Sequence, residues 1–257
     1  MKVVILAGGM GTRLSEETEV RPKPMVEIGG RPIIWHIMQR YAAYGFNEFV
    51  VALGYKGDFI KRYFRDYCAL HGNMTVRMRD GEVQTHERDA EDWTIHLVDT
   101  GLDVMTGGRV KRLESHLSGG TFLLTYGDGV ADIDLRAVVD CHRKQGRTAT
   151  ITAVRPPARF GGLVFANDDE GRVHEFTEKP QIGEGWINGG FMVFEPEIFR
   201  YLDDDQTVLE AHALERLAAE HQLSAYRHQG FWQCMDTMRD VKMLESLWQS
   251  GNPPWHA

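Results

Sequence analysis

The sequence predicts an α/β fold with a mostly parallel, Rossmann-like sheet, helices on both faces and a small β-rich excursion. Three observations support this prediction. Short apolar runs alternate with amphipathic stretches, a glycine-rich segment directly follows the first apolar run, and residues 148–195 are rich in strand-forming residues. Regular alternation of strands and helices is typical of a parallel sheet covered by helices on both faces.

The spacing of apolar residues predicts each element in turn. Unbroken apolar runs predict buried strands at 3–6, 49–53 and 122–126. Apolar residues recur at helical spacing in the stretches 32–41, 59–67, 135–139 and 208–222. Pro32 suits the first turn of the first of these helices. Residues 75–98 predict a polar β excursion with a hairpin turn at Asp80-Gly81, and further strands are expected between residues 148 and 195.

Composition narrows the function classes. The 257 residues are enough for one large α/β domain, so we expect a single domain over 1–257. The formal net charge of −8 argues against a nucleic-acid partner, because nonspecific binding to phosphate backbones needs a basic surface. Cys68, Cys141 and Cys234 lie far apart, and no apolar run is long enough to span a membrane. We therefore expect a reduced, cytoplasmic protein with no membrane partner.

The glycine-rich segment follows the strand at residues 3–6 and reads Ala7-Gly8-Gly9-Met10-Gly11-Thr12-Arg13. Glycines allow a backbone to approach a ligand closely, so successive N–H groups can surround phosphate oxygens, and Arg13 can add charge-assisted hydrogen bonds. A tight turn between strand and helix is the alternative. The P-loop pattern is absent, and the dinucleotide-binding pattern G-x-G-x-x-G fails because its third glycine position is Leu14.

Lys23 lies between Pro22 and Pro24, and these prolines keep the backbone out of a helix. A lysine held this rigidly is suited to stabilising negative charge on a phosphate during transfer. By itself the pattern favours a surface lysine in a stiff loop. After a glycine-rich phosphate loop, the catalytic interpretation is favoured.

Together these motifs resemble the sugar nucleotidyltransferase family, and within it the glucose-1-phosphate cytidylyltransferases. The resemblance covers nearly the whole chain. The glycine loop and the P-K-P motif are the most specific. A glutamate, Glu16, stands where related uridylyl-, thymidylyl- and guanylyltransferases have proline, which favours the cytidylyl branch. The matching segments are Gly8–Thr18, Arg21–Gly30, Thr106–Arg112, Thr125–Asp132, Arg159–Gly161, Glu178–Pro180, Asn188–Phe191 and Gly230–Thr237.

The resemblance implies a nucleotide-binding part at about 1–130 and a sugar-binding and C-terminal part at about 131–257. It implies that Asp128 and Asp236 hold Mg²⁺, an ion that prefers a few carboxylates with phosphate oxygens and water. From the residues alone, Asp128 also fits a turn residue. Asp236 fits the N-cap of a helix about as well as it fits a metal ligand. The nucleotide-binding residues expected are Leu6, Ala7, Gly8, Gly9, Met10, Gly11, Thr12, Arg13, Lys23, Thr106, Arg109 and Gly127.

The resemblance assigns Lys179, with Glu178, to the sugar phosphate, and Asn188 and Gly189 to the sugar side. A solvated charged pair and a plain β-turn or bulge are the respective alternatives. For Arg109, nucleotide contact and a surface position are equally supported.

The implied reaction joins CTP and glucose 1-phosphate to give CDP-glucose and pyrophosphate, with Lys23 and Arg13 catalytic and Mg²⁺ as cofactor. CDP-glucose is a precursor of deoxysugars in bacterial surface polysaccharides. The family commonly assembles, so we expect a homo-oligomer. Another base or sugar, and a non-catalytic nucleotide-sugar sensor of the same fold, remain as alternatives. A sugar-nucleotide dehydrogenase is disfavoured by the failed dinucleotide pattern.

Overall fold

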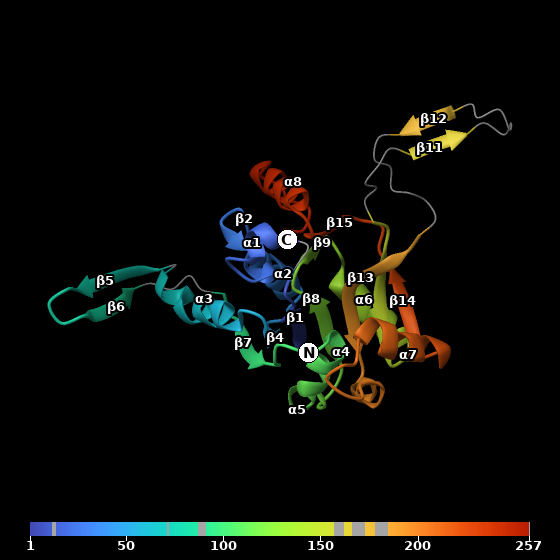
Figure 1. Cartoon of the computed structure of the whole chain (residues 1–257), viewed down its shortest axis with the longest axis horizontal. Helices are drawn as coiled ribbons and strands as arrows, with labels where there is room; N and C mark the ends of the chain where they lie inside the picture. The colour runs from blue at the N-terminus through green and yellow to red at the C-terminus, as the bar shows by residue number, and fades with distance from the viewer. Residues whose placement is uncertain are drawn as a thin grey trace.

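The computed structural model describes residues 1–11, 14–70, 72–86, 91–156, 162–165, 173–177 and 185–256. Its centre is a seven-stranded sheet in the order β14-β10-β13-β8-β1-β4-β7 (Figure 1). The strands, in chain order, are β1 (Val3–Ala7), β4 (Glu48–Leu53), β7 (Thr94–Asp99), β8 (Phe122–Tyr126), β10 (Ala149–Val154), β13 (Ile187–Phe194) and β14 (Leu223–Arg227).

Strand β1 lies at the middle of the parallel part of the sheet. It pairs in parallel with β4 on one side and β8 on the other, and Val3 aligns with both Phe49 and Leu123. Strand β13 runs antiparallel to its neighbours β8 and β10. After β1 the chain adds β4 and then β7 on one side of β1. It then returns and adds β8 on the other side of β1. Such a reversal opens a crevice beyond the carboxyl ends of β1 and β8, where ligands of open α/β sheets bind.

Both faces of the sheet are buried, which explains the unbroken apolar runs of its strands. Val3 and Ile5 pack on one face, and Val4 and Leu6 pack on the other. The first face is covered by α2 (Ile33–Ala42), α3 (Gly57–Leu70), α6 (Leu135–Gln145) and α8 (Met238–Gln249). The second is covered by α4 (Thr106–Arg112), α5 (Glu114–Leu117), η3 (Pro196–Tyr201), η4 (Leu209–Leu214) and α7 (Glu215–Ala219). The predicted fold class is therefore confirmed.

Short elements complete the chain. They are α1 (Ser15–Thr18), η2 (Lys23–Met25), β2 (Glu27–Ile28), β3 (Arg31–Pro32), β5 (Asn73–Arg77), β6 (Glu82–His86), β9 (Gly129–Ala131), β11 (Gly162–Phe165), β12 (Val173–Thr177) and β15 (Trp232–Cys234). Hairpin β5–β6 projects from the end of α3, and hairpin β11–β12 stands away from the sheet (Figure 1). The turn at Asp80-Gly81 and the β-rich excursion were thus predicted correctly. In the described part of the chain, no helix is both long and apolar enough to cross a membrane.

Two predicted elements need correction. Residues 94–98 belong to β7, the edge strand of the central sheet, because they pair in parallel with β4. They are therefore no part of the polar excursion. The helix predicted over 208–222 begins as the π-helix η4 and ends at Ala219, after which the chain turns into β14. Hydrophobic spacing alone does not distinguish a π turn from an α turn over so few residues.

Arg109 joins the carboxyl ends of three parallel strands. Its guanidinium donates hydrogen bonds to the carbonyl oxygens of Gly8 (3.0 Å), after β1, and Leu53 (3.1 Å), at the end of β4. It also donates to the Thr100 hydroxyl (2.8 Å) and to the carbonyl oxygens of Gly101 (2.6 Å) and Leu102 (3.2 Å), all after β7. Only 4 % of Arg109 is exposed, and this burial lowers the pKa of its guanidinium. The expectation of a surface arginine is therefore wrong.

This contact explains one glycine of the loop. A Cβ atom at Gly8 would lie 2.3 Å from Nη1 of Arg109, so any side chain there would displace the guanidinium. Arg109 and Gly8 therefore fix where the glycine loop begins.

We predict that Arg109→Lys lowers the free energy of unfolding by about 2–4 kcal/mol. A compact ammonium cannot reach five acceptors spread around a planar fork. The carbonyl oxygens of Gly8 and Leu53 keep backbone N–H donors, but each buried acceptor left without a donor costs about 1–3 kcal/mol. Urea denaturation with a check of the m-value measures the change. The matched control is Arg112→Lys, because Arg112 and its partner Asp205 are each 45 % exposed, and such pairs contribute about 1 kcal/mol or less. Equal losses in the two variants would contradict the prediction.

Candidate active site

A pocket of about 390 Å³ lies at the crevice between β1 and β8. The glycine loop, the η2 turn, the start of α4 and the turn after β8 form its walls. Its lining contains ten of the residues predicted for the nucleotide and metal sites: Leu6, Ala7, Gly8, Gly9, Gly11, Lys23, Thr106, Arg109, Gly127 and Asp128. The fold therefore brings together segments that are far apart in the sequence, at the edge of the sheet where parallel strands end.

Lys23 is held between two carboxylates. Its Nζ atom donates to Oδ2 of Asp128 and to Oδ1 of Asp236, both at 2.6 Å. Only 8 % of Lys23 is exposed, because Pro22 and Pro24 keep it in the short turn η2 at the floor of the pocket. Burial alone would lower the pKa of Lys23, but the charge of Asp128 and the hydrogen bonds to both carboxylates outweigh it and raise the pKa above its usual value. The ammonium therefore keeps its charge.

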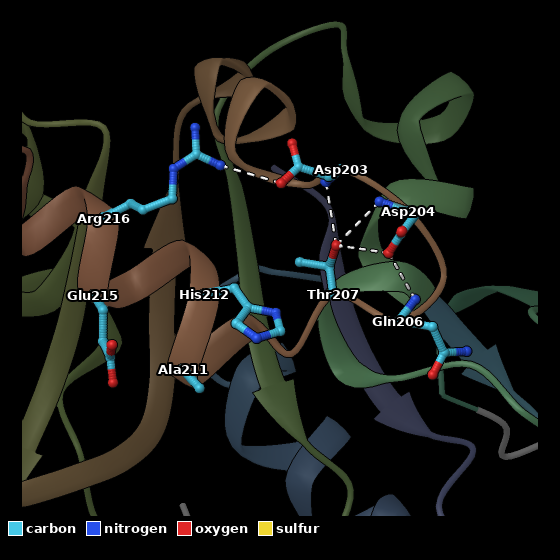
Figure 2. Close-up of a pocket in the computed structure, with 8 residues that line it drawn as sticks. All are labelled: Asp203, Asp204, Gln206, Thr207, Ala211, His212, Glu215 and Arg216. Atoms are coloured by element: carbon cyan, nitrogen blue, oxygen red, sulfur yellow. Dashed lines mark hydrogen bonds and ion pairs between the residues drawn. The ribbon is translucent and has the colours of Figure 1, made fainter.

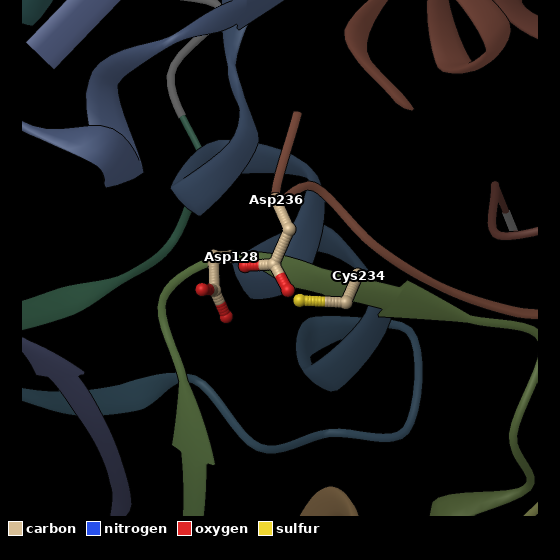
Figure 3. A group of neighbouring side chains, drawn as sticks. All are labelled: Asp128, Cys234 and Asp236. Atoms are coloured by element: carbon tan, nitrogen blue, oxygen red, sulfur yellow. The ribbon is translucent and has the colours of Figure 1, made fainter. Parts of the chain in front are cut away.

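Asp236 reaches this position through a small two-stranded sheet. Strand β9 follows Asp128 and pairs antiparallel with β15, which precedes Asp236. The backbone N–H of Met235 also donates to the carbonyl oxygen of Asp128 at 2.8 Å. Figure 3 shows the two carboxylates close together, with the Cys234 thiol beside Asp236.

The interpretation of Asp236 as a helix cap is wrong. The N-cap of α8 is Thr237, whose side chain accepts from the backbone N–H of Asp240, while the Asp240 carboxylate accepts from the N–H of Thr237 at 2.8 Å. This reciprocal pair forms a capping box. The Asp236 side chain points instead toward Asp128 and Lys23.

The donor set suits a hard divalent cation. Carboxylate oxygens are the ligands that Mg²⁺ prefers, and Asp128, Asp236 and Cys234 offer ligand atoms within 4.8 Å of one another. The Cys234 thiol is a soft ligand that Mg²⁺ does not favour. Burial, with the charge of Asp128, raises the pKa of this thiol and keeps it protonated. The Lys23 ammonium lies where a cation shared by both carboxylates would lie, so the pair already binds one positive charge.

Asn188 and Gly189 lie on the far side of Tyr126 from the glycine loop. The Asn188 side-chain NH₂ donates to the Tyr126 hydroxyl at 3.5 Å, and the Trp232 indole donates to the carbonyl oxygen of Gly189 at 2.8 Å. Gly189 and Gly190 form an irregularity in the pairing of β13 with β10, as the bulge alternative anticipated.

Several predicted residues need separate comment. Thr12, Arg13, Glu178 and Lys179 lie outside the described residues. Met10 is described, but it is exposed and is not among the residues that line the pocket.

The structure adds wall residues that the sequence analysis did not assign to a site. They are Pro24, Val104, Met105 and Tyr126, with Glu210 behind Tyr126. For Tyr126 a signal was available, because it is the last residue of a buried strand that leads into Gly127-Asp128.

A second, more open hollow lies away from this chemistry. It measures about 520 Å³ and is lined by the loop before η4 and by one side of η4 and α7 (Figure 2). Its charged side chains are Asp203, Asp204, Glu215 and Arg216. Three carboxylates against one guanidinium would repel a triphosphate, so the pocket at the glycine loop is the better candidate despite its smaller volume.

Comparison with known proteins identifies the family of this chain. The sequence profile described as nucleotidyl transferase matches residues 2–251. The chain is 49 % identical to glucose-1-phosphate cytidylyltransferase of Salmonella typhi, covering 99 % of this chain and 98 % of that protein. It is 29 % identical to the mannose-1-phosphate guanylyltransferase catalytic subunit beta of Danio rerio, covering 93 % and 62 %. Among solved structures, HddC from Yersinia pseudotuberculosis matches with a TM-score of 0.69 at 22 % identity, covering 96 % and 99 %. The chain therefore belongs to the nucleotidyl transferase family.

Proposed function

We propose that the protein is a glucose-1-phosphate cytidylyltransferase, which converts CTP and α-D-glucose 1-phosphate to CDP-glucose and pyrophosphate. The observation that carries this proposal is the charged centre formed by Lys23, Asp128 and Asp236, of which Lys23 and Asp128 line the glycine-loop pocket. The choice of CTP and glucose rests on the 49 % identity to a relative with that name over nearly the full length of both chains.

In the proposed reaction a phosphate oxygen of the sugar phosphate attacks the α-phosphorus of CTP. The bond from the α-phosphorus to the oxygen shared with the β-phosphate breaks, and pyrophosphate leaves in line with the incoming oxygen. A phosphate dianion is already a competent nucleophile, so no general base is needed. The protein contributes mainly by positioning its substrates and neutralising charge, as in other phosphoryl transfers.

The residues divide this work between them. The backbone N–H groups of the glycine loop and Arg13 hold the triphosphate, and the Lys23 ammonium stabilises negative charge on the α-phosphate. Lys179, with Glu178, binds the sugar phosphate, while Asn188 and Gly189 contact the sugar. The roles of the glycine loop and Lys23 are supported by their place in the lining of one pocket, and that of Asn188 by its hydrogen bond to Tyr126, which also lines it.

Asp128 and Asp236 would hold Mg²⁺ when substrates are bound. The ion supplies neutralisation of the charge on phosphate oxygens. Lys23 serves the same two carboxylates through its ammonium and keeps them from facing one another without a cation between them.

A screen of four nucleoside triphosphates against several sugar 1-phosphates tests the proposed activity. We expect CTP with glucose 1-phosphate to release pyrophosphate fastest. Preference for UTP or dTTP would disprove the cytidylyl assignment and leave nucleotidyl transfer intact. Preference for another sugar with CTP would disprove the glucose assignment only, and binding of CTP and CDP-glucose without turnover would indicate a sensor.

We predict two effects of Lys23→Met. The first is a fall in kcat of about 10²–10³, the usual cost of losing one preorganised charge contact, with a smaller change in CTP affinity. The second concerns stability. With the ammonium gone, Asp128 and Asp236 face one another as like charges, so Tm should fall in EDTA and Mg²⁺ should restore more of it than in the wild type.

Steady-state kinetics, calorimetry of CTP binding and thermal denaturation with and without Mg²⁺ measure these effects. The matched control is Lys242→Met on the exposed side of α8, which should change neither kcat nor the response to Mg²⁺. Weaker CTP binding at unchanged kcat would show that Lys23 only binds the ground state. An equal Mg²⁺ response in variant and wild type would show that the ammonium does not occupy the cation position.

We also propose that the protein is a homo-oligomer and that a second copy covers the arm formed by β5 and β6. Every residue of these two strands is exposed, and Met74, Val76, Met78 and Val83 present apolar side chains to solvent. An isolated two-stranded hairpin is only marginally stable in water, and a contiguous exposed apolar patch of this kind marks an interaction surface. The arm also projects from the body of the molecule (Figure 1).

Light scattering after size exclusion tests the arm. The double variant Val76→Asp, Met78→Asp should shift the molar mass toward that of one 29.2 kDa chain, because two charges would enter an apolar interface. Val20→Asp is the control, since Val20 is 70 % exposed and lies outside the arm. A monomeric wild type would disprove the homo-oligomer, and an unchanged oligomer in the double variant would disprove the role of the arm.

A further inference from the structure

Glu210 connects the nucleotide pocket to the sugar side. Its carboxylate accepts hydrogen bonds from the Tyr126 hydroxyl and from the Thr106 hydroxyl, the latter at 2.7 Å. Tyr126 and Thr106 both line the pocket, whereas Glu210 lies behind them. Glu210 therefore acts on substrates through these neighbours rather than by contact.

The local backbone explains why Glu210 points there. It lies in the first turn of the π-helix η4, and π turns are frequent at functional sites. The backbone N–H of Leu209 donates to the Thr106 hydroxyl at 2.9 Å, which fixes the start of η4 against the start of α4. The next residues, Ala211 and His212, turn to the separate hollow drawn in Figure 2. Glu210 thus faces Tyr126 while its neighbours face away.

The Tyr126 hydroxyl can form its hydrogen bonds to Glu210 and Asn188 in only one direction each. An ionised carboxylate only accepts, so the Tyr126 hydroxyl donates its one proton to Glu210. Burial and the negative charge of Glu210 raise the pKa of Tyr126 well above its usual value, so the phenol keeps this proton. Its oxygen then has only lone pairs to offer. It accepts from the Asn188 NH₂ at 3.5 Å.

The other end of the Asn188 amide is fixed as well. The backbone N–H of Gly190 donates to Oδ1 of Asn188 at 2.9 Å. Gly190 has φ +80°, and a Cβ there would lie 2.5 Å from the Tyr126 ring, so glycine is needed for the ring and the bulge to meet. Both polar atoms of the amide are therefore assigned. Among the described residues, one of its N–H groups and one lone pair of Oδ1 take no partner and can meet a ligand.

We infer that Glu210 is a positioning residue for the sugar side, which orients the Asn188 amide through Tyr126. The inference rests on the proposed function, because it assumes that Asn188 contacts the sugar. Loss of the Glu210 carboxylate frees the phenol proton, which can then be donated to Asn188, and the amide loses its single orientation. The sugar phosphate should bind less well. Loss of Glu210 also removes the acceptor of the Thr106 hydroxyl on the nucleotide side, but the triphosphate is held mainly by the glycine loop, so nucleotide binding should be affected less.

The test compares Glu210→Ala, Glu210→Gln and Tyr126→Phe with wild type, using the substrate pair that the wild type turns over fastest. We expect Glu210→Ala to raise KM for the sugar phosphate roughly tenfold or more, the cost of one hydrogen bond to a charged group. KM for the nucleotide should change less than about threefold. Glu210→Gln should be intermediate, because a carboxamide oxygen still accepts from one of the two hydroxyls while its NH₂ cannot.

The double variant Glu210→Ala, Tyr126→Phe separates positioning from general loss of stability. If Glu210 acts through Tyr126, the double variant should be no worse for the sugar phosphate than the worse single variant. Glu215→Gln on α7 is the matched control, since Glu215 lies on the exposed side facing the other hollow, and it should behave as wild type. Thermal denaturation shows that each variant is folded at the assay temperature.

Additive effects of Glu210→Ala and Tyr126→Phe would overturn the inference, as would equal increases in the two KM values or no increase in either. These outcomes are distinct from failure of the proposed function. A wild type that prefers another nucleotide or sugar disproves the cytidylyl or glucose assignment. The role of Glu210 in orienting Asn188 through Tyr126 is then tested with that preferred pair of substrates.

Discussion

The ion-pair centre of Lys23, Asp128 and Asp236 is the interaction on which the site depends. Two carboxylates at a partly buried position repel each other unless a cation lies between them, and here a lysine of the same chain supplies it at 2.6 Å from each. To meet there, Lys23 needs the proline-bounded turn η2, Asp128 the end of β8, and Asp236 the small sheet β9–β15. The turn η2, the end of β8 and the small sheet thus each place one of these three charges.

The parallel sheet imposes a second constraint, because several strand ends must be held at one edge. Arg109 donates to the carbonyl oxygens of Gly8 and Leu53, which also accept from the backbone N–H groups of Tyr55 and Thr100, and to carbonyl oxygens after β7. One buried cation thereby joins the ends of β1, β4 and β7. This contact also places a fixed positive charge beneath the glycine loop, where the proposed triphosphate would bind.

Much of the fold was predictable because burial on both faces leaves a clear record in the sequence. The strands at 3–6, 49–53 and 122–126 were predicted from their apolar runs. The glycine loop and Lys23 were predicted from a pattern typical of phosphate-binding sites. Asp236 was ambiguous because Thr237, its neighbour, is an equally good cap and proved to be the one used. The burial of Arg109 could not be predicted from the sequence. Its acceptors are mostly backbone carbonyl oxygens, which every residue type has. Glu210 was hidden within a stretch whose spacing fits an ordinary helix.

The position of Lys23 also constrains how the site changes when substrates bind. An ammonium bridging Asp128 and Asp236 and an ammonium at the α-phosphate are two placements of one flexible side chain, and it cannot fill both at once. If Lys23 moves to the phosphate, the carboxylates require another cation, because leaving them together without one would be unfavourable. Asp128 and Asp236 would then hold a divalent cation, which would supply the missing positive charge. The same pair of aspartates thus explains why a lysine is held in the site before substrates bind and why a metal would be needed afterwards.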